Sequence, residues 1–308
     1  MNRFQKITSE IKKAINGKDR AIVISLLAII AEGNILIEDI PGVGKTTMAV
    51  AFSKALGLDY KRVQFTPDTL PSDVTGFSVY DKESGKMIFN KGAVFCNLFL
   101  ADELNRTSSR TQSALLEAME ERQVTIDGKS FKLQSPFSVI ATQNPTGASG
   151  TQLLPDSQVD RFMVRISMGY PDKDAECKMI LNRSESNPLD SVKRVVTKEE
   201  LAAMQLKAKQ VYVHNEMAEY IVTLIRRTRT HGLVSRGASP RAALSLTDMA
   251  KALAFAENRD YIVPRDIQNV FISTLNHRII LTPEATARKL TADNILKDIL
   301  NTTKQPRI

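Results

Sequence analysis

The chain has 308 residues, 43% of them hydrophobic, a net charge of +8 and an isoelectric point near 9.4. This composition predicts a globular protein with a real core. The longest apolar run, residues 21–30, is shorter than the roughly 20 residues of a membrane span. Two cysteines, Cys96 and Cys177, are too few for a disulfide framework, and the N-terminus carries no export signal, so we expect a cytoplasmic protein.

A strand, a glycine-rich turn and a helix are predicted in succession from residue 34 to residue 57. The turn, DIPGVGKT at 39–46, matches the phosphate-binding P-loop pattern, except that Asp39 occupies the usual first glycine. The glycines let the backbone curl round a phosphate, and the lysine can reach the β- and γ-phosphate oxygens. A turn that binds nothing is the alternative. The predicted ATP-binding residues are Pro41, Gly42, Val43, Gly44, Lys45, Thr46 and Thr47.

A second apolar strand, NLFLADE at 97–103, ends in two carboxylates. Asp102 is placed to hold Mg²⁺ together with the Thr46 hydroxyl, and Glu103 to activate the attacking water. Taken alone, a strand that ends in two solvated carboxylates is common. Together with the P-loop, it predicts ATP hydrolysis.

Three further polar residues are candidates for the same site. Asn144 lies at the end of the apolar strand predicted in FSVIATQNP, 137–145, and can hold water or the γ-phosphate; its alternative is a turn former. Arg161 lies in LLPDSQVDRF, where it can instead be a surface partner of Asp160. Arg241 follows Ser239-Pro240 in the first turn of a helix, where a cation opposes the helix dipole and therefore suggests an anionic partner, either phosphate or an ordinary salt bridge.

Alternating apolar residues around glycine turns predict two hairpins, at 76–92 and 124–133. After residue 170 long amphipathic runs follow, and these predict helices. The predicted fold is therefore α/β, with a parallel-sheet core at 1–170 and a smaller, all-helical lid domain at 171–308. The hairpins either project toward a partner or cap the edge of the sheet.

The chain resembles the MoxR family of AAA+ ATPases. The resemblance covers nearly the whole chain and rests on EDIPGVGKT, FTPDTLPSDVTG, KGAVFCNLFLADELNRTSSRTQSALLEAMEERQV, ATQNP, LLPDSQVDRF and ASPRAALSL. It implies that Asn144 is sensor 1, Arg161 the arginine finger offered to a neighbouring protomer and Arg241 sensor 2. It also implies ATP and Mg²⁺ as cofactors, a homo-oligomer in the form of a hexameric ring, and a von Willebrand factor A domain protein as partner.

We therefore expect a Mg²⁺-dependent ATPase that remodels or matures protein partners. Two other functions stay open. One is an AAA+ nucleic-acid motor, which the basic isoelectric point favours; its binding would weaken steeply with salt. The other is a nucleotide-gated scaffold with little turnover, against which Glu103 and Asn144 argue.

Overall fold

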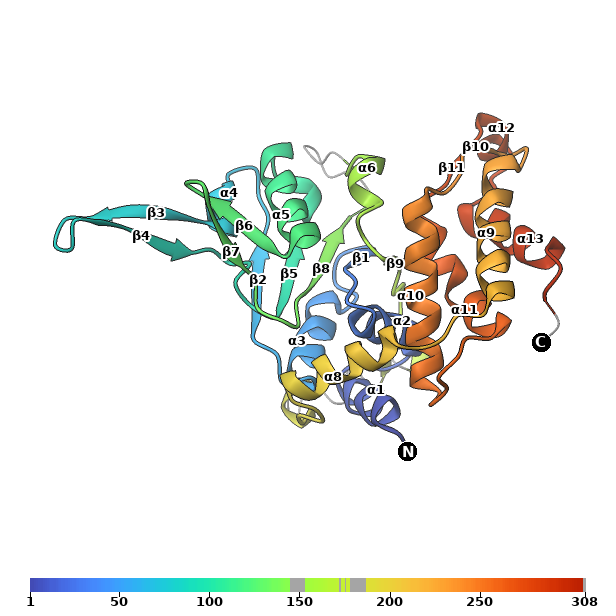
Figure 1. Ribbon diagram of the computed structural model, residues 1–308, viewed down its shortest axis with the longest axis horizontal. Helices are drawn as coiled ribbons and strands as arrows, with labels where there is room; N and C mark the ends of the chain where they lie inside the picture. Colours follow the sequence, from blue (N-terminus) through green and yellow to red (C-terminus); the bar gives the residue numbers. More distant parts are fainter. Residues whose placement is uncertain (145–152, 172, 175, 178–186, 307–308) are drawn as a thin grey trace.

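The computed structural model describes residues 1–144, 153–171, 173–174, 176–177 and 187–306. A five-stranded sheet lies at its centre, with two hairpins at one end and a helical lid at the other (Figure 1). The predicted α/β fold with a parallel sheet is confirmed. Among the described residues, no helix is both long and apolar enough to cross a membrane.

The five strands of the central sheet are all parallel. Their order is β2 (Tyr60–Gln64), β5 (Leu98–Asp102), β8 (Ser138–Gln143), β1 (Ile35–Glu38) and β9 (Val164–Ile166). Because parallel strands end at one edge of a sheet, the residues that follow β1, β5 and β8 come together there. This edge carries the P-loop and both predicted catalytic strand ends.

Alternate residues of each strand enter two separate hydrophobic clusters, as the pleat of a strand requires. Ile35 and Ile37 of β1 pack with the first helices and the lid, whereas Leu36 packs on the other side with α5 (Ser109–Glu121). The strands β5 and β8 are buried along their whole length, which is typical of parallel strands covered on both faces. The first three helices are α1 (Arg3–Ala14), α2 (Asp19–Ile30) and α3 (Lys45–Ala55).

Both predicted hairpins are present, and they project from one end of the core (Figure 1). The rings of Phe89 and Phe131 stack at 4.0 Å and join the two hairpins. Asp127 and Gly128 both have positive φ, as a tight Asp-Gly hairpin turn requires. The elements in this part are α4 (Pro71–Thr75), β3 (Gly76–Asp81), β4 (Lys86–Lys91), the 3₁₀ turn η1 (Leu104–Arg106), β6 (Gln123–Ile126) and β7 (Lys129–Lys132).

In its described residues the lid is helical, as predicted, apart from one short antiparallel pair of strands, β10 (Val234–Arg236) and β11 (Ile280–Leu281). Strands this short carry no readable alternation, so the expectation of an all-helical lid missed them. The division at residue 170 stays a prediction. The other elements are the 3₁₀ turn η2 (Pro188–Ser191), α8 (Lys198–Lys209), α9 (Asn215–Thr230), α10 (Pro240–Ala256), α11 (Pro264–Leu275), α12 (Pro283–Ala287) and α13 (Ala292–Thr302).

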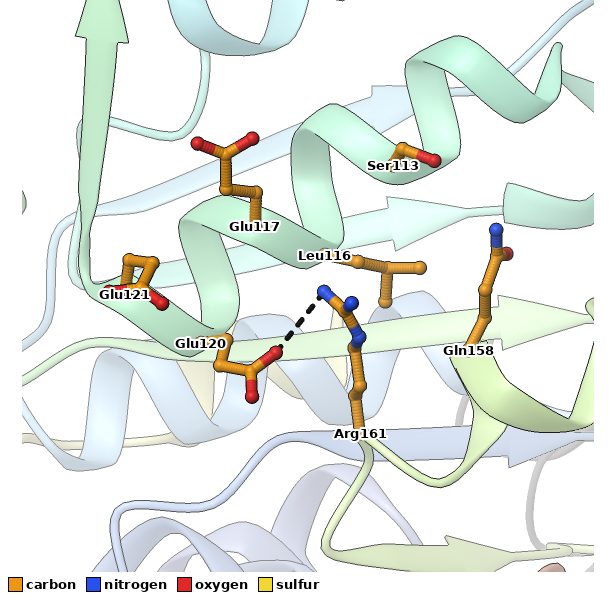
Figure 2. A pocket seen from close by; sticks show the side chains of 7 residues that line it. All are labelled: Ser113, Leu116, Glu117, Glu120, Glu121, Gln158 and Arg161. Atoms are coloured by element: carbon orange, nitrogen blue, oxygen red, sulfur yellow. Dashed lines mark ion pairs between the residues drawn. The ribbon is translucent and has the colours of Figure 1, made fainter.

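A short helix, α6 (Asp156–Val159), stands beside α5 and leads into β9. A cavity of about 270 Å³ lies between α5 and this segment. The side chain of Arg161 reaches across it toward Glu120 on α5 (Figure 2). The α5 side of the cavity is acidic, since Glu117 and Glu121 also line it.

Candidate active site

The turn after β1 has the backbone of a phosphate-binding loop. Gly42 and Gly44 have φ of +85° and +93°, a region that residues with a side chain rarely adopt. Glycine is favoured here by the backbone conformation and not by a steric clash, because a Cβ on Gly42 would meet no atom within 4 Å. The loop leads directly into α3, whose first turn has no side-chain cap. The free N–H groups of that turn form an anion-binding site.

Lys45 begins α3 and folds back over the loop. Its Nζ donates to the carbonyl oxygen of Asp39 at 2.6 Å. Burial lowers the pKa of Lys45, while the carboxylates of Asp39, Asp102 and Glu103 oppose that shift. The ammonium group is thus half-buried at the loop, where phosphate oxygens would replace the carbonyl as acceptors.

The structure explains the departure from the P-loop pattern at Asp39. This carboxylate is buried, and it accepts hydrogen bonds from the N–H of Ile40 and the hydroxyl of Ser167. It also accepts from the N–H groups of Met168 and Gly169. Burial alone would raise the pKa of Asp39, but the hydrogen bonds outweigh burial and hold the pKa below its ordinary value. Asp39 therefore ties the P-loop to the segment after β9.

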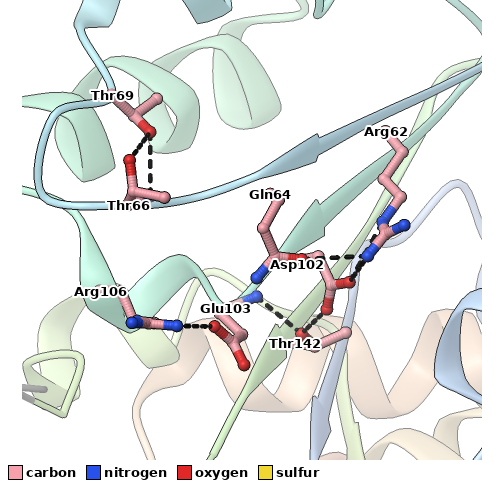
Figure 3. Close-up of polar contacts among 8 residues, drawn as sticks. All are labelled: Arg62, Gln64, Thr66, Thr69, Asp102, Glu103, Arg106 and Thr142. Atoms are coloured by element: carbon pink, nitrogen blue, oxygen red, sulfur yellow. Dashed lines mark hydrogen bonds and ion pairs between the residues drawn. The ribbon is translucent and has the colours of Figure 1, made fainter.

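The carboxylate of Asp102, at the end of β5, accepts three hydrogen bonds from two partners (Figure 3). The Thr142 hydroxyl donates to its Oδ1 at 2.6 Å. Arg62 donates to Oδ2 from Nε at 3.2 Å and from Nη2 at 2.8 Å. Sequence reasoning missed both partners, because their proximity depends on the register of β2 and β8 against β5.

Glu103 follows Asp102 with φ of +56°, an unusual conformation for a residue with a side chain. Residues held in sparsely populated backbone regions cluster at functional sites. The N–H of Glu103 donates to Thr142 Oγ1 at 2.8 Å, and its Oε2 lies 2.6 Å from Nη1 of Arg106 (Figure 3). The predicted general base is thus held by a neighbouring cation, a partner that the sequence pattern did not suggest.

Asn144 comes directly after β8, the neighbour of β5 in the sheet. The pairing of Ala101 with Ala141 aligns the ends of the two strands. Asn144 therefore lies at the same edge as Asp102 and Glu103, where a sensor of bound phosphate belongs.

A cavity of about 540 Å³ adjoins the P-loop and has mostly apolar walls. Gly42, Val43, Gly44 and Thr47 form one wall of it. Lys18 forms another, and its Nζ donates to the carbonyl oxygens of Gly169 and Tyr170 at 3.0 and 2.7 Å. The nucleoside part of a nucleotide fits the size and character of this cavity, with the phosphates at the loop.

The two predicted arginines, Arg161 and Arg241, come together on α5, apart from the P-loop partners described above. Both guanidinium groups pair with the carboxylate of Glu120, Arg161 at 3.2 Å to Oε2 and Arg241 to Oε1. The two cations come from the core and from the lid, 80 positions apart in the sequence. One exposed face therefore presents both.

Thr46 and Asp102 offer a hydroxyl and a carboxylate oxygen, which are ligands that suit Mg²⁺. Within the part of the chain that the structure describes, no group of three or more His, Cys, Asp and Glu side chains could hold a metal ion. Mg²⁺ bound with nucleotide keeps several waters and takes its remaining ligands from phosphates and one or two side chains, and Thr46 and Asp102 would be those side chains.

Comparison with known proteins places this geometry in a family. The family described as "ATPase family associated with various cellular activities (AAA)" matches residues 34–164, and the AAA lid domain matches residues 226–299. YeaC of Bacillus subtilis is 43% identical over 98% of this chain and 94% of its own length. Chaperone MoxR1 of Mycobacterium tuberculosis is 34% identical, covering 100% of this chain and 84% of MoxR1.

The likeness extends to a solved structure. The crystal structure of an ATPase candidate from Cytophaga hutchinsonii is 39% identical and superposes with a TM-score of 0.92. The match covers 99% of this chain and 96% of that one. The chain belongs to the MoxR family of AAA+ ATPases.

Proposed function

We propose that the protein is a Mg²⁺-dependent ATPase that hydrolyses ATP between the subunits of a ring and uses the energy to remodel protein partners. One observation carries the proposal. Lys45, Asp102 and Glu103 gather at the carboxyl edge of the sheet, whereas Arg161 and Arg241 lie together against α5. A neighbouring protomer can therefore supply the two cations that complete the site.

The P-loop and the first turn of α3 bind the phosphates of ATP, and the 540 Å³ cavity takes the adenosine. On binding, Lys45 exchanges the carbonyl oxygen of Asp39 for the β- and γ-phosphate oxygens. Asp39 itself keeps the loop in place through its carboxylate. Thr46 and Asp102 would hold Mg²⁺, which would neutralise charge on the phosphate oxygens.

In the hydrolysis step, water attacks the γ-phosphorus and the bond between that phosphorus and the β,γ-bridging oxygen breaks, leaving ADP and phosphate. Glu103 accepts the proton of the water. To do so its carboxylate leaves Arg106, to which it is paired in this structure. Asn144 orients the water through its amide.

We assign Arg161 and Arg241 to the site of the next protomer. Both cations pair with Glu120 on a shared surface, so one neighbour can meet both at once. The γ-phosphate of that neighbour then replaces Glu120 as the anion. Sensor 2 thereby acts in trans, as the arginine finger does.

A protein substrate is supported by family membership, because one relative bears the name Chaperone MoxR1. The hexameric ring and a partner with a von Willebrand factor A domain follow from the family resemblance. The exposed hairpin β3–β4 offers a surface for such a partner, since Phe77, Tyr80 and Met87 are all at least half exposed.

Mixed rings test the proposal. Arg161→Ala and Glu103→Gln should each bind ATP and hydrolyse it poorly. In an equal mixture, a subunit that keeps Glu103 meets a neighbouring subunit that keeps Arg161 at about a quarter of the interfaces of a closed ring. The ATPase activity should therefore recover toward that fraction. Subunit exchange is checked with labelled protomers. A mixture that exchanges and yet stays as inactive as its parts would show that Arg161 does not act in trans.

A further inference from the structure

Arg278, just beyond the C-terminal end of α11, is a buried cation whose contacts surround the segment that carries Arg161. Its side chain is 1% exposed. The Nη2 atom of Arg278 donates to the carbonyl oxygens of Asp160 at 3.1 Å and Phe162 at 2.8 Å. These carbonyls flank Arg161 on both sides. The backbone that presents the arginine finger is thus bound before and after the finger itself.

The side chain of Asp160 completes this contact. Its Oδ1 lies 2.9 Å from Nε of Arg278 as an ion pair, although without the angle of a hydrogen bond. Burial lowers the pKa of Arg278 to about 10, and the charge of Asp160 opposes that shift. The guanidinium therefore stays protonated at neutral pH.

The same cluster extends to the helix that carries Arg241. Arg278 donates to Ser245 Oγ at 3.1 Å, and Ser239 Oγ donates to Asp160 Oδ2 at 3.1 Å. Ser239 and Ser245 belong to the start and body of α10, on either side of Arg241. Arg278 and Asp160 thus join the two segments that present Arg161 and Arg241.

Stability alone is a weak reason for a charge in this position. Apolar residues that fill the same volume often stabilise a protein as well as a buried ion pair does. The guanidinium fixes the relative positions of the groups that it contacts, because its N–H donors reach several acceptors at once in a set geometry. Two of those acceptors are the carbonyl oxygens on either side of Arg161, and a third, Ser245 Oγ, lies one turn after Arg241 on α10. The fourth is the carbonyl oxygen of Thr274 on α11.

We propose that Arg278 is a positioning residue, which acts through Asp160 and α10 to hold Arg161 and Arg241 in the orientation that a neighbouring subunit requires. The proposal rests on the action of Arg161 in trans. Arg278 itself touches no nucleotide. It also ties the finger to the lid, so a shift of the lid moves both arginines together.

The test uses Arg278→Met, which removes the charge and keeps most of the volume. ATP affinity should be unchanged, because the P-loop is untouched. Turnover should fall roughly 10- to 100-fold, the cost of a misplaced group. Arg236→Gln is the matched control. This substitution breaks another ion pair between lid and core, that of Arg236 with Asp156 at 2.7 Å. Both side chains of that pair are more than half exposed, so the turnover of the variant should be unchanged.

Mixed rings separate positioning from a structural defect. The ATPase activity of Arg278→Met mixed with Glu103→Gln should recover toward about a quarter of full activity. At those interfaces the Arg278→Met subunit provides an intact site, and the Glu103→Gln subunit provides a correctly held Arg161. Arg278→Met mixed with Arg161→Ala should not recover, because neither supplies a working finger. Recovery in that second mixture, unchanged turnover in Arg278→Met, or lost ATP affinity would each overturn the proposal.

Two further measurements keep the outcomes distinct. If Arg278→Met does not fold, Asp160→Asn decides, because it breaks the ion pair, can keep the bond from Ser239, and should give the same pattern of mixtures. The mixture of Arg161→Ala with Glu103→Gln is the reference. If the reference fails to recover, the trans mechanism itself is wrong; if only the Arg278 mixtures deviate, the positioning role alone is wrong.

Discussion

The carboxylate of Asp39 joins the start of the P-loop to the segment that leads from β9 toward the lid. Four donors converge on it, three of them from Ser167, Met168 and Gly169. Lys18 holds the same segment through the carbonyl oxygens of Gly169 and Tyr170. Asp39 thus couples the position of the phosphate-binding loop to the position of the segment after β9.

Asp39→Asn should lower the free energy of unfolding by about 1–3 kcal/mol, because an amide in place of the carboxylate leaves buried donors unpaired. The folded-state pKa of Asp39 lies below its ordinary value, so the charge stabilises the fold above about pH 4–5 and this contribution is lost as the pH falls through the folded-state pKa. Urea unfolding of both proteins from pH 8 to pH 3 provides the test. The difference between their free energies of unfolding should stay constant near neutral pH and become smaller at the acidic end.

The exposed carboxylate of Asp68 provides the control, and Asp68→Asn should leave stability unchanged. If Asp39→Asn is as stable as the unaltered protein at pH 7, the carboxylate does not hold the loop as described.

At the scale of single residues, the sequence predicts those groups whose roles follow from neighbours along the chain. Lys45, Asp102 and Glu103 are of this kind, because a strand followed by a loop or by two acids has a recognisable pattern. Arg62 and Thr142 are not, since each lies 40 positions from Asp102 and meets it only through the pairing of strands. No local pattern carries that register.

At the scale of elements, β8 contributes more to the site than the strand-terminal Asn144. Its Thr142 hydroxyl donates to Asp102 and accepts from the N–H of Glu103, so one oxygen fixes both acidic residues. The hydroxyl is buried with no exposed surface on its residue. The strand therefore sets the geometry of its neighbour β5.

Thr142→Val, nearly the same shape without the hydroxyl, should reduce the free energy of unfolding by about 1–3 kcal/mol, because a buried N–H and a buried carboxylate oxygen lose their partner. Turnover should fall with it, as Asp102 and Glu103 lose a shared support. Thr142→Ser keeps the oxygen and should recover most of both. Thermal unfolding and ATPase rates of the three proteins provide the comparison, and a Val variant equal to the Ser variant in both would contradict the role.

Most elements could be predicted because their boundaries carry chemistry. The helix α8 begins at a capping box of Thr197 and Glu200, a pattern that is visible in the sequence, and α11 begins at Pro264. Ser239 shows the limit of such reasoning. It occupies the N-cap position of α10, but its hydroxyl bonds to Asp160 and does not cap the helix. A tertiary contact has taken over a local one.

At the scale of the whole molecule, the arrangement of Arg161 and Arg241 is what the sequence could least predict. They lie in different parts of the chain, and the anion that joins them in this structure is Glu120 on a third element. The sequence predicted that each arginine meets an anion. Only the folded arrangement, in which both side chains reach Glu120 on α5, places both arginines on one face.

Glu103 is the proposed base on which ATP hydrolysis at this site depends. The most direct measurement is ATP affinity and ATPase rate for Glu103→Gln, with Glu284→Gln as a control on an exposed lid carboxylate. Glu103→Gln should bind ATP as tightly as the unaltered protein, while turnover falls by about 10²-fold or more, because the amide keeps the shape but cannot accept the proton. The control should keep both. Turnover that persists in Glu103→Gln would contradict the assignment of the base and with it the proposed reaction at this site.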